Sequence, residues 1–199
     1  VMTKAARKHR HIPNRYYESC NIAVKIDRDT VSPCSQLRHK SILTPFVEKM
    51  PFKAVLGFLG DLALDLGGTV GTLGTDEEYI VFSSDGKPKT ATAICYESTD
   101  GRYISQLVGR GAELIFIITN DGWWKNSPGH RQHAAFASLR AIENRRPIAR
   151  SANTGISCFV SPKGESMQQT EYWKEAVIKQ TLYPQKEITF YTKYGDYIY

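Results

Sequence analysis

Residues 90–98 have the sequence TATAICYES, and their pattern decides which fold the rest of the chain is expected to adopt. Residues 90–94 are β-branched or small throughout, which predicts a strand buried on both faces. The Asp100-Gly101 pair then breaks the strand, and an amphipathic run follows. Cys95 therefore ends a buried strand just before a helix, where α/β folds place their chemistry. On the strand alone, the simpler interpretation is a core residue, because free cysteine is among the most buried residue types.

Strands and helices alternate along the remainder of the sequence. A second apolar run at 114–119 predicts another fully buried strand. The spacing of apolar residues predicts helices over 102–111 and 134–145, the second introduced by Ser127-Pro128. Further strands are expected at 20–27, 79–82, 148–151 and 156–160, and a further helix at 52–66. This alternation predicts an α/β fold.

Length and composition are typical of one globular domain. The 199 residues are enough to bury a sizeable core, and 41% are hydrophobic and 23% charged. No apolar run reaches the about 18 residues that a membrane-spanning helix needs, and no signal peptide is recognisable. The chain opens on Val1 rather than Met, so we expect it to be a piece of a longer protein.

The net charge of +6 is concentrated near the beginning of the chain. Residues 1–40 hold nine Lys and Arg residues against three acidic ones. Such a basic end can meet nucleic acid or anionic lipid, or it can be a solvated loop. No nucleic-acid-binding motif accompanies it, so no nucleic-acid partner is expected.

The four cysteines, Cys20, Cys34, Cys95 and Cys158, are widely spaced. They form no CxxC pair, so the spacing gives no indication of a zinc site and no metal is expected. A disulfide between Cys20 and Cys34 stays open as an alternative to two thiols.

Four segments in a fixed order carry a family resemblance. They are HKSILTPFVEKMPF at 39–52, ICYES at 94–98, IITNDGWW at 117–124 and HRQHAAFASLRAIENRRPIARSANTGIS at 130–157. In this order they resemble the nitrilase, or carbon–nitrogen hydrolase, superfamily, and more narrowly the apolipoprotein N-acyltransferase family. The resemblance extends from about Tyr17 to the end of the chain, and it implies the nitrilase αββα sandwich.

The resemblance also implies a catalytic set. The family's lysine lies in an H-K motif and matches Lys40, its second glutamate lies in a P-x-x-E-x-x-P frame and matches Glu48, and its nucleophile matches Cys95. A nearby cation lowers the pKa of a thiol, which suits Lys40 beside Cys95. A buried ammonium needs a carboxylate, which suits Glu48. Taken singly, Lys40 and Glu48 would be ordinary surface residues.

Two residues after the nucleophile have expected supporting roles. The backbone N–H of Tyr96, together with Lys40, can stabilise the oxyanion of a tetrahedral intermediate. Glu97 lies two positions past Cys95 and can help to position the site.

A polar and aromatic loop follows the second buried strand. Asn120, Trp123 and Trp124 belong to it and are expected at the same sheet edge as Cys95. In the resembled family the equivalent loop approaches the acyl chain and the membrane, and tryptophan prefers that interface. The alternative is that the two tryptophans anchor the core.

One departure from the family pattern is important. The family's general base is a glutamate in a W-P-E-like motif upstream of the lysine, and no such motif occurs in the 199 residues. The only glutamate before Lys40 is Glu18, in the different context YYESC. We therefore expect the amino-terminal part of the domain and the amino-terminal membrane helices to be missing, and the family's final membrane helix to follow Tyr199.

The resemblance implies acyl transfer without a cofactor. The acyl donor would be a phospholipid, the intermediate a Cys95 thioester, and the acceptor the α-amine of a diacylglyceryl-cysteine on an apolipoprotein. The parent protein would lie in the bacterial inner membrane with this domain on the periplasmic side. The alternatives are a soluble nitrilase-type amidase that uses water as acceptor, and a non-catalytic lipid- or lipoprotein-binding remnant, which the missing glutamate favours.

Overall fold

The computed structural model describes residues 2–8, 17–26, 36–45, 48–49, 73–76 and 78–197. The chain divides into two compact units, Val1–Glu78 and Tyr79–Tyr199, which are described separately. The expected helix over 52–66 and the thiol of Cys34 lie outside the described residues. The expectation that both units belong to one catalytic domain stays a prediction.

The first unit contains an antiparallel three-stranded sheet in the order β1-β2-β3. Its strands are β1 Met2–Lys8, β2 Tyr17–Val24 and β3 Leu37–His39. The alternation in the sequence predicted the central strand three residues too late, at 20–27. Cys20, Ile22 and Ala23 are buried, and they supply the apolar contacts of this sheet.

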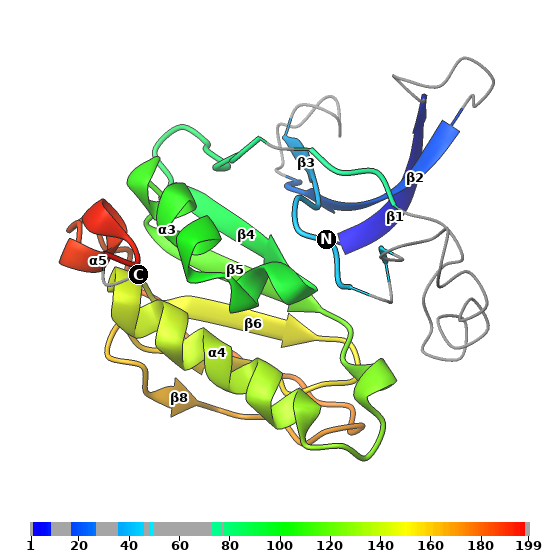
Figure 1. Cartoon of the computed structure of the whole chain (residues 1–199). Helices are drawn as coiled ribbons and strands as arrows, with labels where there is room; N and C mark the ends of the chain where they lie inside the picture. The colour runs from blue at the N-terminus through cyan, green and yellow to red at the C-terminus, as the bar shows by residue number, and fades with distance from the viewer. Residues whose placement is uncertain are drawn as a thin grey trace. The chain divides into compact units, whose positions relative to one another are not determined.

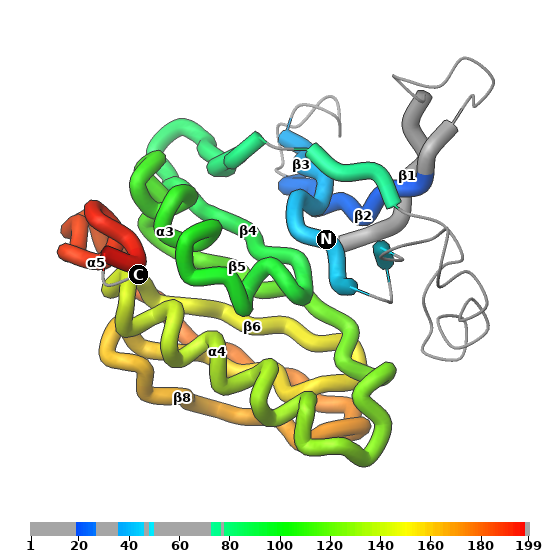
Figure 2. Tube along the Cα trace, viewed as in Figure 1, coloured from blue at the N-terminus to red at the C-terminus, as the bar shows by residue number. Residues whose placement is uncertain are grey.

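The second unit is built on a five-stranded sheet in the order β4-β5-β6-β7-β8. The strands are β4 Thr90–Ile94, β5 Leu114–Thr119, β6 Ile148–Ala152, β7 Cys158–Val160 and β8 Ser166–Met167. The first three pair in parallel and the last two antiparallel. Because β4, β5 and β6 are parallel, their carboxyl ends meet at one edge of the sheet, as the backbone trace shows (Figure 2).

Two helices cover one face of this sheet (Figure 1). They are α3 Gly101–Gly109 and α4 Gly129–Asn144, which contact each other as well as the strands. In α3, Ile104, Leu107 and Val108 are fully buried, as the helical spacing predicted. A short helix, α5 Phe190–Tyr194, packs against both of them.

Small residues let α4 lie close to the sheet. Ala137 and Ala141 are fully buried on its inner face. The helix begins at Gly129, five residues before the predicted start, directly after Pro128 at the N-cap. It ends where Arg145 adopts a left-handed conformation, two residues before Pro147.

Two predicted strands are shorter than expected. Of residues 79–82 only Phe82 pairs with the sheet, through two hydrogen bonds with Thr90, while the Tyr79 ring stacks near Tyr103 instead. The strand predicted from residue 156 begins at Cys158. Its first carbonyl, that of Ile156, accepts a hydrogen bond from a buried arginine rather than joining the ladder.

Candidate active site

Cys95 lies at the turn that joins the end of β4 to a 3-10 helix, η2 Cys95–Thr99. Its φ angle is +52°, in the left-handed region that non-glycine residues rarely adopt. Two buried side chains stabilise this turn. The Glu97 carboxylate accepts a hydrogen bond from the backbone N–H of Ile94 at 2.7 Å, and the Ser98 hydroxyl donates to the Cys95 carbonyl at 2.8 Å. The turn therefore presents a half-buried thiol at the edge of the sheet.

The Cys95 thiol opens on a cavity of about 260 Å³. Its walls are mostly aromatic or apolar and come from η2, from the loop after β5 and from the first two turns of α4. The lining residues are Cys95, Tyr96, Thr99, Trp123, Trp124, Gly129, Gln132, His133 and Phe136. An apolar cavity next to a nucleophile suits a substrate with a hydrocarbon part.

Trp123 and Trp124 form one wall of this cavity. They belong to a short 3-10 helix, η3 Gly122–Trp124, and their rings stack with centroids 4.2 Å apart. Both are partly exposed, so neither is a fully buried core residue. Asn120 shapes this loop, because its carbonyl accepts from the Trp123 indole at 2.7 Å and its side chain accepts from Gly122 N–H and the Thr154 hydroxyl.

A buried polar cluster lies next to the Cys95 turn. Asp121, two residues after the end of β5, accepts a hydrogen bond from Arg150 of β6 at 2.8 Å and lies 2.8 Å from Nδ1 of His133 on α4. The Thr119 hydroxyl also donates to Asp121, at 3.0 Å. On the other side of its ring, His133 Nε2 lies 3.2 Å from both the Cys95 carbonyl and the Ser98 hydroxyl.

Asp121 is ionised in this cluster. Burial by itself raises the pKa of Asp121, but the hydrogen bond from His133 and the charge of Arg150 outweigh it and lower the pKa from 3.8 to about 2. The ionised Asp121 and its partner Arg150 therefore form a buried charged pair in the second unit, next to the Cys95 turn.

Asp121, His133 and Arg150 were not predicted as site residues from the sequence. Two signals in the sequence point to them. Asp121 follows an apolar strand that neighbours the Cys95 strand, and His133 lies within the first two turns of the helix that comes next. Their partner Arg150 shares a face with Ile148 in a predicted strand, and a charge on a buried face needs a counter-charge.

The first unit contains the predicted lysine–glutamate pair. Lys40, directly after β3, is fully buried, and its Nζ donates to Glu48 Oε2 at 2.6 Å. The same carboxylate accepts from the backbone N–H of Thr44 at 2.8 Å and from the Asn21 side chain. Asn21 is a partner that the sequence analysis missed.

Lys40 and Glu48 belong to the first unit and Cys95 to the second. That these three side chains converge on one catalytic site therefore stays a prediction, as do the roles expected for Tyr96, Glu97 and the tryptophan loop.

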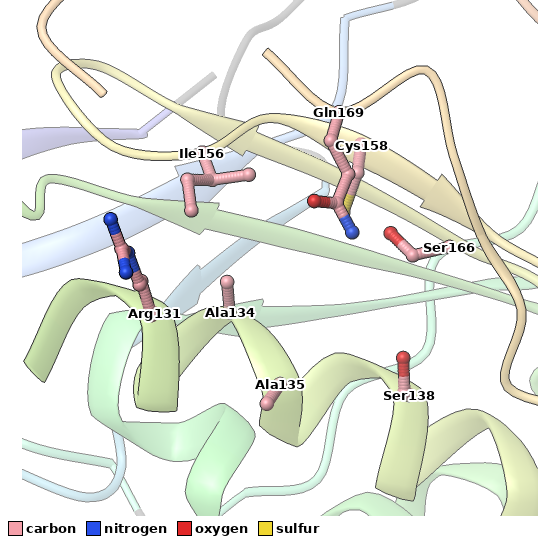
Figure 3. A pocket seen from close by; sticks show the side chains of 8 residues that line it. All are labelled: Arg131, Ala134, Ala135, Ser138, Ile156, Cys158, Ser166 and Gln169. Carbon is pink, nitrogen blue, oxygen red and sulfur yellow. The ribbon is translucent and has the colours of Figure 1, made fainter. Parts of the chain in front are cut away.

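A second cavity, of about 340 Å³, lies between α4 and the strands β7 and β8. Figure 3 shows Arg131, Ala134, Ala135 and Ser138 of the helix facing Ile156, Cys158, Ser166 and Gln169. The thiol of Cys158 is 2% exposed, and burial raises its pKa. Because a thiol is nucleophilic only as the thiolate, this larger cavity is the weaker candidate for catalysis.

Two further observations concern the described residues. Within them, no three His, Cys, Asp or Glu side chains come together in a way that could hold a metal ion. None of the helices in this part of the chain combines the length and the hydrophobicity needed to cross a bilayer.

The chain matches one protein family and individual proteins of known name. The carbon–nitrogen hydrolase family matches residues 6–188. Apolipoprotein N-acyltransferases of Chlorobaculum tepidum and Geobacter metallireducens are 38% and 30% identical, over 82% and 77% of this chain. The chain spans less than a third of either relative, 31% and 29% of their lengths.

Solved structures agree on the fold. An amidase from a Nesterenkonia species superposes with a TM-score of 0.54 at 16% identity, covering 78% of this chain and 52% of the amidase. Nit3 of Saccharomyces cerevisiae, a member of the nitrilase superfamily, superposes with a TM-score of 0.55 at 15% identity, covering 79% and 51%. The expected nitrilase-like α/β fold is therefore confirmed, and this chain belongs to the carbon–nitrogen hydrolase family.

Proposed function

We propose that this chain is part of the catalytic domain of an apolipoprotein N-acyltransferase, with Cys95 as the nucleophile. The observation that carries the proposal is the aromatic cavity on which Cys95 opens. The stacked rings of Trp123 and Trp124, together with Phe136, form walls that suit the first part of a fatty acyl chain. The similarity to enzymes of that name supports the same assignment.

The first half of the proposed reaction moves an acyl group from a phospholipid to Cys95. The thiol loses a proton, Sγ forms a bond to the ester carbonyl carbon, and the oxygen becomes an oxyanion. When the intermediate collapses, the bond from carbon to the glycerol oxygen breaks, and that oxygen leaves with a proton as lysophospholipid. In the second half, the α-amine of a diacylglyceryl-cysteine attacks the thioester, and the thiol is restored.

Lys40 and Glu48 have complementary roles in this proposal. The ammonium of Lys40 stabilises the thiolate and the oxyanion. Glu48 holds the ammonium in one orientation, because it accepts hydrogen bonds from Lys40 at 2.6 Å and Thr44 at 2.8 Å. This arrangement needs the two units to bring Lys40 to Cys95.

The substrates place the proposed reaction at a membrane surface. A phospholipid donor and a lipidated acceptor both reside in a bilayer, and partly exposed tryptophans next to the cavity suit the headgroup region. We propose the bacterial inner membrane, with the domain on the periplasmic side and the membrane contact supplied by the parent protein.

Acyl-enzyme formation tests the proposal. The full-length protein is incubated with a phospholipid that carries a fluorescent acyl chain, and a hydroxylamine-labile fluorescent band is expected on the wild type. The band should be absent for Cys95→Ala and present for the matched control Cys158→Ala. Transfer of the label to a diacylglyceryl peptide is then expected, whereas release as free fatty acid without transfer would favour the amidase-like alternative. A labelled Cys95→Ala protein would overturn the proposal.

A further inference from the structure

We infer that His133 is a positioning residue, which fixes the Cys95–Tyr96 peptide so that the Tyr96 N–H is aimed at the developing oxyanion. The inference deepens the proposed function and rests on Cys95 being acylated. Two groups surround the Cys95 carbonyl. The Ser98 hydroxyl donates to that oxygen at 2.8 Å, and His133 Nε2 lies 3.2 Å from it.

The contacts of the His133 ring identify Nε2 as its donor toward the Cys95 turn. The hydroxyl proton of Ser98 is already directed to the Cys95 carbonyl, so both neighbours of Nε2, at 3.2 Å, are acceptors. The other nitrogen, Nδ1, lies 2.8 Å from the ionised carboxylate of Asp121 and 3.2 Å from Nη2 of Arg150. A lone pair on Nε2 would face the lone pairs of two acceptors, so Nε2 is the nitrogen that donates to the Cys95 carbonyl.

Asp121 and Arg150 hold the ring in this orientation. Arg150 donates to one oxygen of the Asp121 carboxylate and to the carbonyl of Ile156, while His133 contacts the other carboxylate oxygen. Asp121, Arg150 and His133 are at most 4% exposed, so solvent does not compete for these bonds. The orientation of the imidazole is thus set by groups from β6 and from the loop after β5.

Holding the Cys95 carbonyl in place affects catalysis through the geometry of the peptide unit. The C=O and N–H of one trans peptide lie in one plane and point in opposite directions. Fixing the Cys95 carbonyl therefore fixes the direction of the Tyr96 N–H, and a donor that is already in place at the start of the reaction stabilises an oxyanion most effectively. A hydrogen bond to the carbonyl also polarises the N–H of the same peptide.

Comparing two reactions of the same thiol in the full-length protein tests the inference. Acylation by p-nitrophenyl butyrate forms a carbon–sulfur bond, passes through an oxyanion and releases p-nitrophenolate. Alkylation by iodoacetamide forms a carbon–sulfur bond and releases iodide without any oxyanion. Removing an oxyanion donor typically costs about 10²–10³-fold, so His133→Asn should slow acylation by roughly 10–100-fold and leave alkylation of Cys95 within about twofold.

Side-chain geometry predicts a ranking of variants. Glutamine carries its amide near the position of Nε2 and asparagine near that of Nδ1, so His133→Gln should recover part of the acylation rate that His133→Asn loses. Ser98→Ala removes the second donor to the same carbonyl and should show the same selective loss, which keeps the test valid if His133 variants fold poorly. His130→Asn is the matched control, because His130 lies on the same helix, is 7% exposed and bonds to the Ser127 carbonyl instead.

The possible results separate this inference from the proposed function. Equal losses in acylation and alkylation would assign His133 a purely structural role, and unchanged acylation would remove it from the reaction; either overturns the inference. The p-nitrophenyl ester reports on His133 even if no phospholipid acylates the wild type, in which case only the proposed function fails. If Cys95 accepts neither acyl donor, both fail.

Discussion

The Nζ atom of Lys40 lies 2.6 Å from Oε2 of Glu48, and the lysine side chain is completely buried. The pair gives the first unit a charged centre that has no access to water on the lysine side. Taking an ammonium out of water is costly unless a counter-charge and hydrogen bonds replace the solvent. Glu48 supplies the counter-charge and is itself held by Thr44 and Asn21.

Replacing Glu48 by Gln should destabilise the first unit markedly. The substitution preserves the shape of the side chain but leaves the Lys40 ammonium buried without a counter-charge, which typically costs roughly 3–5 kcal/mol. Adding Lys40→Met to this variant should restore much of the free energy of unfolding, because the unpaired charge is then removed. Urea unfolding of the wild type and the two variants measures this, and a double variant no more stable than Glu48→Gln would contradict it.

Cys95 should react with a thiol probe faster than the other three cysteines. It is half-buried and lines an open cavity, whereas burial raises the pKa of Cys158 and Cys20 is fully buried. Timed alkylation of the full-length protein followed by peptide mass spectrometry ranks the four sites. Comparable labelling of Cys20, Cys34 and Cys95 would argue against an activated thiol.

Asp121 should make the second unit sensitive to acid. Its pKa is about 2 in the fold and 3.8 in an unfolded chain, so the unfolded state binds the proton first as the pH falls. The contribution, roughly 2 kcal/mol, is complete above about pH 4 and is lost as the pH falls through 2. Asp121→Asn should abolish this dependence and be less stable at neutral pH. A free energy of unfolding that changes equally with pH in both proteins would contradict the prediction.

Gly129 should tolerate no side chain, because a Cβ atom there would meet the ring of Trp124. Gly129→Ala is expected to displace Trp124 from the cavity wall and to lower acyl transfer, with a loss of stability. The matched control is Gly109→Ala in α3, where a Cβ would meet nothing within 4 Å. In that position alanine should be neutral or stabilise by up to about 1 kcal/mol. Tryptophan fluorescence and acyl-enzyme formation distinguish the two variants.

Residues 1–199 alone should show almost no acyl transfer. The W-P-E-like motif of the resembled family is not among them, and general base catalysis is typically worth about 10²–10⁴-fold. Lys40 cannot replace the base while it is protonated. The fragment is compared with a chain extended upstream through that motif, using a fluorescent phospholipid and a lipopeptide acceptor. Equal turnover by both would mean that another residue, such as Glu97 or Glu18, serves as base.

The limits of the central strands were predictable because their signal is strong and local. Residues 90–94 are β-branched or small and residues 114–119 form an apolar run, and both strands have the predicted limits. The prediction that the second strand is fully buried is wrong, because Phe116 on one face is 38% exposed. The strand predicted at 79–82 was too long, because only Phe82 of these residues pairs with a strand residue, Thr90. The residue pattern cannot show which positions find a pairing partner. The start of α4 was placed late because residues 129–133 contain little apolar periodicity.

The polar cluster beside Cys95 was not predicted, for a different reason. Asp121, His133 and Arg150 come from three elements and meet only after the parallel strands are ordered side by side. Periodicity reports which face of an element is buried, and it says nothing about which buried polar groups pair. Lys40 and Glu48 were found because the family motif, rather than any local pattern, links them.

The left-handed conformation of Cys95 lowers the stability of the fold at the position of the proposed nucleophile. A side chain at φ +52° is strained by about 1–2 kcal/mol, and glycine would relieve that strain. Random mutation followed by selection for thermal stability alone should therefore favour Cys95→Gly over Cys95→Ala, although glycine cannot accept an acyl group. Under the proposed function, cysteine at this turn keeps the nucleophile in place of the residue that would give the most stable backbone.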